Sequence, residues 1–424
     1  MSTILIKNIR AVDAKNDVYT DVFISDGKIA EVGQNIRLGA EEVIDGTDLV
    51  LMPSLFDMHV HLRDPGFTHK EDVLTGCSAA LAGGVTGILA MPNTKPPCDN
   101  PDTLRYIIEK SSNTGVDVYP AGCITKGMSG GSLCEYEALK EAGCICVSDD
   151  GRPVENAEMM RKALELSKNH GLLVASHCED LSIISGGIMN NGEISAKLGV
   201  KGMDRASEDY ITAREMILAH SVDARIHICH VSTKGSVDMI RFAKAKGVKV
   251  TCETAPHYFM LTEALLENRD ADYRMNPPLR TSADVEAIIG GIKDGTIDCI
   301  ITDHAPHTSE EKKDFESAPN GVVGLETSFA AALTALCHTG EISLNKLVEI
   351  MCVNPRRILG LEIPAIQPGK TADLIIADLN RIWKVEPEKL HSKSHNTAFK
   401  GMTLKGKPIV TISKGIIRYD DRKK

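Results

Sequence analysis

The chain of 424 residues has few aromatic side chains and no long apolar segment. Phe, Trp and Tyr make up 4% of it, with a single Trp, although hydrophobic residues as a whole make up 42%. No apolar run approaches the roughly 20 residues that span a membrane, and the apolar run at the N-terminus is too short for a signal peptide. The composition is typical of a globular protein that does not act in a membrane.

An excess of basic residues is also missing. The 48 Lys and Arg are outnumbered by 58 Asp and Glu, which gives a net charge of −10. Proteins whose main partner is nucleic acid or an anionic membrane carry clustered positive charge instead. We therefore expect neither partner.

The cysteines form no disulfide framework. All twelve are spread along the chain without a CxxC pair, and the closest two, Cys144 and Cys146, fall in an apolar segment. Disulfide-stabilised secreted domains are short and rich in cysteine, whereas a chain of this length buries a sufficient core without such bonds. We expect reduced thiols and a cytoplasmic location.

The middle of the chain repeats a strand followed by an amphipathic helix, for example the helical pattern at 155–170. Continuous apolar strands that alternate with helices are typical of a parallel sheet buried on both faces. The predicted strands are 51–55, 87–90, 116–119, 144–147, 172–175, 225–229, 248–252 and 298–301. Eight such units close a (β/α)8 TIM-type barrel, which is the α/β fold that we predict.

Both ends of the chain contain short alternating apolar runs separated by turn residues, which predict antiparallel strands. Neither end has enough strands to bury a face alone, so we expect one small β-sandwich domain formed from both chain ends. Its N-terminal part is predicted at 1–52 and its C-terminal part at 361–424, with the barrel at 53–360. Two long connections in the barrel, 179–207 and 258–280, are expected to cover a site.

Side chains that can bind metal follow five of the predicted barrel strands. His59 and His61 are two residues apart on a strand, so they project from the same face. A lone His-x-His is a weak signal, but further candidates follow later strands, at the end of a barrel where active sites form. The set is His59, His61, Asp150, His177, His230 and Asp303. Six imidazole and carboxylate ligands exceed one tetrahedral zinc and favour two ions that share a carboxylate.

Such a centre predicts hydrolysis. A divalent ion lowers the pKa of bound water, so that hydroxide becomes available as the nucleophile, and it can polarise a carbonyl group. A nearby carboxylate can accept a proton and deliver it to a leaving nitrogen, a role that suits Asp303 at the end of the last strand. The alternative is that these groups only cap strands and bond to loop backbone. The barrel predicts their location independently, which favours the metal centre.

Other polar residues at the same rim predict the substrate. Arg63 lies two residues beyond His61, and its planar guanidinium group suits a carboxylate. Asn93, Asn276 and His307 would complete a pocket for an anion and an amide, although each alone is more typical of a loop-stabilising residue. Together with Arg63 they predict a small anionic substrate that contains an amide.

Four further residues near the predicted strand ends are expected to be structural. His257 follows the seventh strand and is expected to make a structural hydrogen bond, and His227 lies within a strand and is expected to pack. Cys178 and Cys229 adjoin predicted ligands, but strand alternation turns them to the opposite face, so we expect them in the core.

The chain resembles the dihydroorotases of the amidohydrolase superfamily over nearly its whole length, and most of all their longer class I type. Asp57-Met-His-Val-His-Leu-Arg-Asp-Pro-Gly resembles the first signature of the family, and Thr302-Asp-His-Ala-Pro-His resembles the second. Intermediate blocks are similar at 84–94, 275–280 and 324–327. The resemblance implies reversible hydrolysis of (S)-dihydroorotate to N-carbamoyl-L-aspartate, a step of de novo pyrimidine biosynthesis.

The resemblance also implies a zinc centre. Asp150 would bridge two zinc ions, and Asp303 would be the proton carrier. The other ligands would be His59 and His61, with Asp303, for one ion, and His177 and His230 for the second. Many relatives bridge their metals with a carboxylated lysine where this chain has Asp150, and some relatives with an aspartate there bind one metal. Two ions are therefore predicted, with one as the alternative.

Substrate contacts follow from the same resemblance. Arg63, Asn93 and His307 would bind the substrate carboxylate, and His61 would also contact the substrate. Asn276, Asn320 and Gly321 would close around the ring, although relatives often have Phe or Pro at the position of Asn320. The charged segment 308–318 has few apolar anchors and would act as a mobile lid.

Two competing interpretations remain open. A cyclic amidase of the dihydropyrimidinase, hydantoinase or allantoinase kind would share the barrel and the metals, but its uncharged substrates give no reason for Arg63 beside the two histidines. A non-catalytic homologue would only support a partner such as aspartate carbamoyltransferase, and it would be expected to lack metal ligands. Association with that enzyme alongside catalysis stays open, and a homodimer is a family-level expectation.

Overall fold

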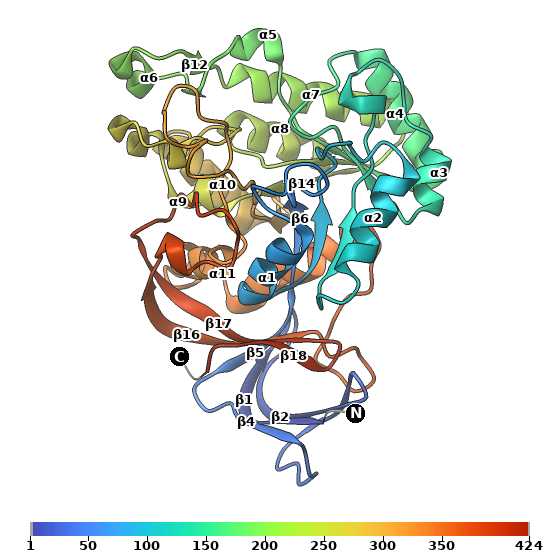
Figure 1. Cartoon of the computed structure of the whole chain (residues 1–424), viewed down its shortest axis with the longest axis vertical. Helices are drawn as coiled ribbons and strands as arrows, with labels where there is room; N and C mark the ends of the chain where they lie inside the picture. Colours follow the sequence, from blue (N-terminus) through green and yellow to red (C-terminus); the bar gives the residue numbers. More distant parts are fainter. Residues whose placement is uncertain (1–2, 423–424) are drawn as a thin grey trace.

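Two β-sheet systems of different character divide the chain in the computed structural model, which describes residues 3–422. Parallel strands surrounded by helices form the larger part, and a mixed sheet lies at one end of it (Figure 1). Within the described part of the chain, no helix is both long enough and apolar enough to cross a membrane.

Eight parallel strands form a closed barrel. One group contains β6 (Leu55–Val60), β7 (Val85–Ala90) and β8 (Asp117–Pro120). The other contains β9 (Cys146–Val147), β10 (Leu173–Ser176), β13 (Ile226–Ile228), β14 (Val250–Thr254) and β15 (Cys299–Ile300). Single parallel bridges from Gly122 to Val147 and from Val60 to His304 join the two groups. The predicted (β/α)8 barrel is confirmed.

The first barrel strand begins later than the sequence predicts. Residues Val50–Pro53 form β5, which pairs with β1 and β16 of the small sheet and is not a barrel strand. The barrel strand β6 begins at Leu55. A nearly continuous apolar run from Val50 to Phe56 supplies both strands, so burial alone could not show that the chain passes from one sheet to the other between them.

Helices cover the outside of the barrel and bury residues against it. In α4 (Ala157–His170) the buried residues Met160, Ala163, Leu164 and Ser167 recur at helical spacing. The side chain of Asn156 caps the first turn of α4, and Gly171 in the left-handed conformation ends it. The other outer helices are α1 (Val73–Ala82), α2 (Pro101–Ser111), α3 (Tyr136–Glu141), α7 (Ala206–Ser221), α8 (Lys234–Ala245) and α10 (Ser282–Asp294).

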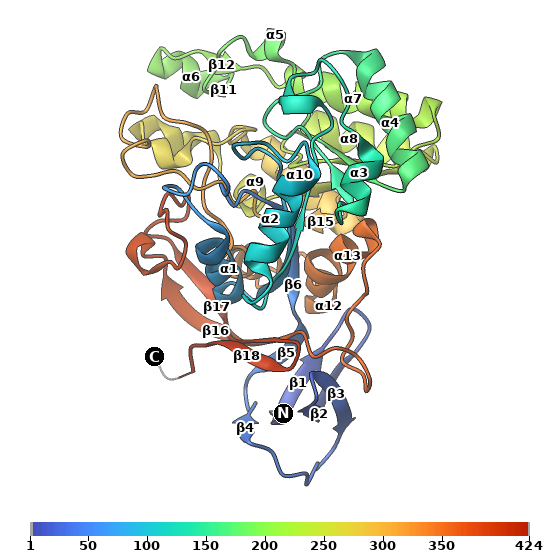
Figure 2. The ribbon, with the colours of Figure 1, turned by 45° about the vertical axis from the view of Figure 1, so that its right-hand side comes forward.

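The two long connections carry short elements of their own. The first contains α5 (Leu181–Ile184), β11 (Met189–Asn190), α6 (Glu193–Leu198) and β12 (Gly202–Met203). The second contains the end of α9 (Pro256–Met260) and two 3-10 turns, Glu263–Asn268 and Ala271–Tyr273. After β15 the chain forms α11 (Ser328–Ala332), α12 (Leu344–Val348) and α13 (Asn354–Leu359). Figure 2 shows α12 and α13 near the junction of the barrel with the small sheet.

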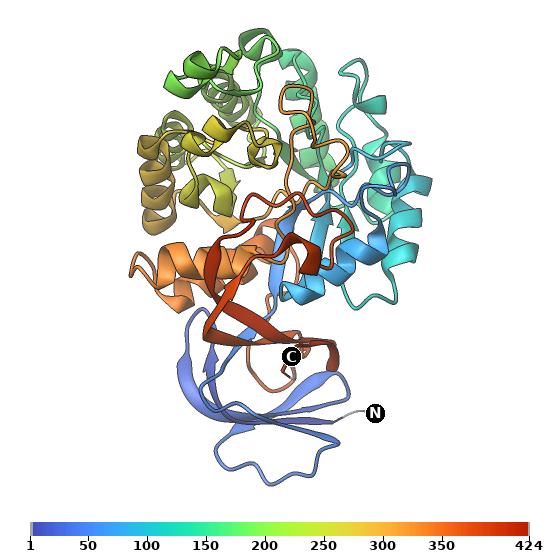
Figure 3. The same ribbon diagram turned by 60° about the vertical axis from the view of Figure 1, so that its left-hand side comes forward.

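The small sheet combines both ends of the chain, as Figure 3 shows. Its order is β18-β17-β16-β5-β1-β2-β3, with β4 paired to β1. From the N-terminal side come β1 (Ile4–Val12), β2 (Asp17–Ser25), β3 (Lys28–Gly33) and β4 (Glu42–Asp45), and from the C-terminal side β16 (Leu374–Lys384), β17 (Thr403–Ser413) and β18 (Ile416–Asp420). Antiparallel pairing of β16 with β5 joins the two halves, so the expected β domain from both chain ends is present.

Gly83, at the end of α1, has no room for a side chain. A Cβ atom there would lie 2.0 Å from the carbonyl oxygen of Leu325. We expect Gly83→Ala to lower the free energy of unfolding by about 2 kcal/mol or more, because backbone must move. Gly290 in α10 has nothing within 4 Å of an added Cβ, so Gly290→Ala is the matched control. The control should stabilise by up to about 1 kcal/mol. Denaturant unfolding measures both changes, and equal stabilities would contradict the contact.

Candidate metal centre

The six predicted ligands converge at the C-terminal ends of the barrel strands. His59 lies on β6 and His61 just beyond it, and the other four follow β9, β10, β13 and β15 in chain order. Each of the six side chains is buried, with Asp303 the most exposed at 6%. The ligands come from strands that are distant in sequence, and the parallel barrel brings their ends to one face.

Asp150 lies at the centre of this group. Its Oδ1 atom is 3.3 Å from Nε2 of His59 and 3.4 Å from Nε2 of His230, and its Oδ2 atom is 3.4 Å from Nε2 of His61. Nδ1 of His177 is 3.5 Å from Oδ1. Burial alone would raise the pKa of Asp150, but the surrounding histidines hold this pKa well below its ordinary value. One ionised carboxylate therefore lies between the two predicted histidine pairs.

The donor atoms fit divalent metal ions. Those of His59, His61 and Asp150 lie within 4.8 Å of one another, and the same holds for Asp150, His177 and His230. Nε2 of His59 is buried and has no hydrogen-bond partner in the described residues, which is the state expected of a nitrogen that binds a metal. Imidazole and carboxylate donors suit zinc or a similar ion. The cluster could hold one ion on each side of Asp150.

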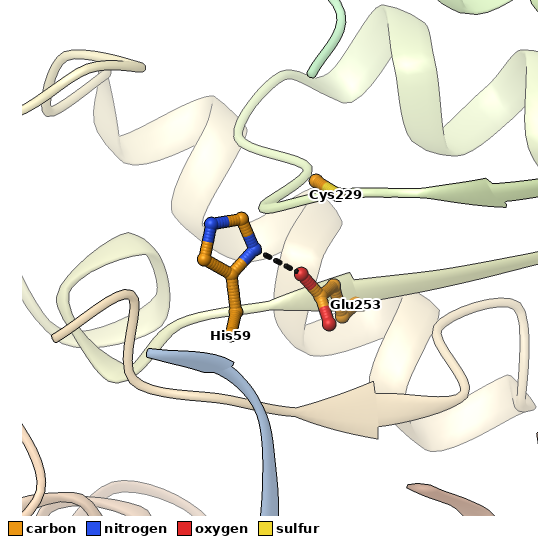
Figure 4. Close-up of side chains that lie close together, drawn as sticks. All are labelled: His59, Cys229 and Glu253. Carbon is orange, nitrogen blue, oxygen red and sulfur yellow. Dashed lines mark hydrogen bonds and ion pairs between the residues drawn. The ribbon is translucent and has the colours of Figure 1, made fainter. Parts of the chain in front are cut away.

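Glu253, which the sequence analysis missed, lies beside the ring of His59 and orients it (Figure 4). Its Oε1 atom lies 2.7 Å from Nδ1 of His59, so Nδ1 carries the proton and Nε2 faces Asp150. The Oε2 atom of Glu253 is 3.1 Å from Nε2 of His227, close enough for an ion pair but not aligned as a hydrogen bond. The other ring nitrogen of His227, Nδ1, lies 2.8 Å from Oγ1 of Thr251. Burial favours protonation of Glu253, but His227 and His59 lower its pKa to about 2. His227 thus does more than pack.

Cys229 lies closer to the site than strand alternation predicts. It is buried in the barrel core, as expected, yet its sulfur lies within 4.8 Å of donor atoms of His59 and Glu253. Regular alternation ends here because β13 stops at Ile228 and His230 has a φ of 33°. Burial raises the pKa of the Cys229 thiol to about 12, so the thiol stays protonated and is a poor ligand at neutral pH.

A cavity of about 270 Å³ opens above the metal centre. Its wall includes all the residues predicted to contact the substrate, namely His61, Arg63, Asn93, Asn276, His307, Asn320 and Gly321. Five of the six predicted metal ligands line it, because His61 belongs to both sets and is joined by Asp150, His177, His230 and Asp303. The structure therefore brings the predicted ligands and the predicted substrate residues into one site. Their roles stay predictions.

Two cations, Arg63 in the cavity wall and Lys70 behind it, lie on either side of a neutral histidine, His307. Arg63 donates from Nε to the carbonyl oxygen of Pro306, and its Nη2 atom lies 3.3 Å from Nε2 of His307. Nζ of Lys70 lies 3.3 Å from Nδ1 of the same ring. Burial, with the charges of Arg63 and Lys70, lowers the pKa of His307 to about 2. Burial lowers the pKa of Arg63 only to about 10, so it stays charged at pH 7.

Two further residues depart from the sequence analysis. Glu179 was missed, yet its Oε2 atom is 3.2 Å from Nε2 of His177 and its Oε1 atom accepts a hydrogen bond from Asn276. The spacing of two between His177 and Glu179, the same as in His59-x-His61, could have found it. His257 is buried, as a structural residue would be, but its Nε2 atom has no hydrogen-bond partner within the part of the chain described, so the expected structural hydrogen bond is not made by this nitrogen.

Replacing Glu253 with Gln should weaken metal binding. The amide keeps the size of the side chain but loses the charge that holds Nδ1 of His59, so we expect about 10- to 100-fold lower affinity. Competition with a chromogenic chelator measures this change. Cys229→Ala is the matched control, because it removes a side chain from the same side of His59 without removing the carboxylate. If Cys229→Ala lost metal and Glu253→Gln did not, the assignment would be reversed.

Comparison with known proteins agrees with these features. A family described as Dihydro-orotase-like matches residues 48–236. Proteins named Dihydroorotase include that of Citrifermentans bemidjiense, 49% identical over 98% of this chain and 99% of the relative. That of Acetivibrio thermocellus is 46% identical over 97% of each. Among solved structures, an L-hydantoinase (dihydropyrimidinase) from Arthrobacter aurescens has a TM-score of 0.90 at 26% identity, covering 99% of this chain and 97% of the other. The chain belongs to the dihydroorotase family.

Proposed function

We propose that the protein is a metal-dependent dihydroorotase that reversibly hydrolyses the cyclic amide of (S)-dihydroorotate to N-carbamoyl-L-aspartate in de novo pyrimidine synthesis. The observation that carries this proposal is Arg63 beside His307 on the wall of a cavity that also contains the converging metal ligands. A substrate with a carboxylate next to a cyclic amide matches both halves of this cavity.

The metal ligands would divide around Asp150. His59 and His61, with Asp303, would hold one zinc ion, and His177 and His230 would hold a second, with Asp150 shared between them. Bound ions of this kind would activate water and polarise the amide carbonyl of the substrate. Glu253 and Glu179 would keep the rings of His59 and His177 oriented.

Asp303 would transfer the proton. Its Oδ1 atom is 3.1 Å from Nε2 of His61, and its side chain lines the cavity. Although burial favours the protonated form, His61 and His59 lower the pKa of Asp303, so it starts as a carboxylate. The carboxylate accepts a proton from the attacking water and returns it to the ring nitrogen when the amide bond breaks. Ring closure would use the same steps in reverse.

The substrate carboxylate would bind to Arg63, His307 and Asn93. Oδ1 of Asn93 is 2.8 Å from Nδ1 of His61, so the carbonyl end of the amide holds that histidine. The NH2 group of Asn93 is then free to donate to the substrate. Asn276, Asn320 and Gly321 line the cavity and would enclose the ring.

Several finer features belong to the same proposal. We expect a cytoplasmic enzyme and, at the level of the family, a homodimer; association with aspartate carbamoyltransferase stays an open alternative. The runner-up function is hydrolysis of an uncharged ring, because solved structures named hydantoinase or dihydropyrimidinase share this fold. Arg63 favours dihydroorotate over that alternative, since an uncharged ring would give the largely buried charge of Arg63 no anion to pair with in the cavity.

Ring opening of dihydroorotate by zinc-loaded protein, with dihydrouracil, hydantoin and allantoin in parallel, tests the proposal. We expect strong preference for dihydroorotate. Arg63→Met should lower kcat/KM for dihydroorotate by roughly 100-fold, because a charged hydrogen-bond partner of the carboxylate is lost, and leave the metal content unchanged. Arg105→Met, at an exposed arginine of α2, is the control. Activity on the uncharged rings alone would overturn the substrate assignment.

Replacing Asp303 with Asn should nearly abolish turnover. The amide cannot accept the proton, so we expect kcat to fall by about 10²- to 10⁴-fold. Steady-state kinetics with metal content measured on the same samples separates loss of the proton carrier from loss of metal. Turnover close to that of the unchanged protein, with metal still bound, would contradict the role of Asp303.

A further inference from the structure

The segment 308–318, between β15 and α11, is more firmly anchored than its sequence suggests. Its charged residues and few apolar ones predict a mobile lid, but Phe315 and Ala318 are buried and Lys312 is only 8% exposed. The guanidinium carbons of Arg269 and Arg274 lie 5.8 and 5.9 Å from the centre of the Phe315 ring. The segment therefore packs on the rest of the protein by more than one contact.

Lys312 is unusual among these anchors because, among the described residues, only backbone carbonyl groups accept its hydrogen bonds. Its Nζ atom donates hydrogen bonds to the carbonyl oxygens of Arg274, Pro319 and Gly321, at 3.1, 3.0 and 3.0 Å. It makes no ion pair with a carboxylate of residues 3–422. Three carbonyl groups match the three N–H bonds of an ammonium group. Burial lowers the pKa of Lys312 to about 7, a sign of how much solvation the amine has lost.

The three carbonyl groups belong to segments that form the substrate cavity. Asn320 and Gly321 line the cavity, and Arg274 lies two residues before the cavity residue Asn276. The N–H of Gly321 also donates to the carbonyl oxygen of Arg274, at 3.0 Å. Gly321 has a φ of +136°, and a Cβ atom there would lie 2.7 Å from Cβ of Ala305. The backbone at Gly321 is therefore packed closely against Ala305.

A buried amine whose hydrogen bonds all go to three carbonyl groups favours one arrangement of those acceptors. Moving any one of the three carbonyl groups away would leave a buried polar group without its partner, which costs free energy. Neither the 274–276 segment nor the 319–321 segment belongs to a barrel strand. Lys312 therefore constrains the cavity wall and not the barrel.

We propose that Lys312 is a positioning residue for substrate binding, which holds the segments of Asn276 and of Asn320–Gly321 in the arrangement that encloses the substrate ring. The proposal rests on the proposed function, because it assigns the effect to dihydroorotate binding. In this account 308–318 is a fixed support behind the cavity, and Lys312 connects it to the two segments that carry the cavity residues Asn276, Asn320 and Gly321.

The test compares Lys312→Met with Lys313→Met in the zinc-loaded full-length protein. Methionine keeps the length and apolar stem of lysine but removes all three donors. Lys313 is adjacent and its side chain is 68% exposed, so it is a matched control. We expect Lys312→Met to raise KM for dihydroorotate about tenfold or more, with kcat within about twofold and metal content unchanged, because binding is lost equally in ground and transition states. Lys312→Gln, which keeps two donors, should be intermediate and replaces the Met variant if that does not fold.

Hydrogen exchange at the Gly321 amide provides a readout that does not need substrate. It should be faster in Lys312→Met than in Lys313→Met, because the bond to the Arg274 carbonyl opens more often. Unchanged KM with unchanged exchange would overturn the proposal, as would an equal loss in both variants. If the unaltered protein did not turn over dihydroorotate but Gly321 exchange still rose only in Lys312→Met, the proposed function would be wrong and the positioning of the cavity wall would stand.

Discussion

A single buried carboxylate, that of Asp150, organises the active end of the barrel. Four histidines from three other strands lie 3.3 to 3.5 Å from its two oxygen atoms, in pairs on either side. A carboxylate this deeply buried is stable only if opposite charge or strong donors surround it. Protonated histidines or bound metal ions both meet that condition, and Nε2 of His59, which has no hydrogen-bond partner in residues 3–422, favours metal. The arrangement of the strand ends follows from this requirement.

The metal centre and the substrate cavity are held in place by different means. Around the metal ligands, side-chain carboxylates fix the orientation of two imidazole rings: Glu253 contacts His59, and Glu179 contacts His177. Around the substrate residues, backbone carbonyl groups also act as anchors, such as those that accept from Arg63 and Lys312. Ligands at the ends of strands are held by the rigid barrel, whereas cavity residues on loops need additional contacts to hold them.

Much of the fold and of the site could be predicted from the sequence, because both follow from the spacing of apolar residues and from the position of polar residues at the ends of strands. Two-residue spacing at a strand end placed His59 and His61 on one face, and the repeat of strands and helices gave the barrel. What could not be predicted depends on partners far apart in the chain. Glu253 lies inside β14, 194 positions from His59, and nothing in its local pattern shows that the two meet. Similarly, Lys312 stands in the charged run 310–313, yet it is buried while its neighbour Lys313 is exposed.

Anomalous X-ray diffraction near the zinc absorption edge, from crystals of the zinc-loaded protein, tests the central role of Asp150 most directly. The account predicts two peaks at the strand ends, one beside His59 and His61 and one beside His177 and His230, with Asp150 in contact with both. A metal ion that binds without contacting Asp150 would contradict this account. A metal ion held by His59, Cys229 and Glu253 would also contradict it.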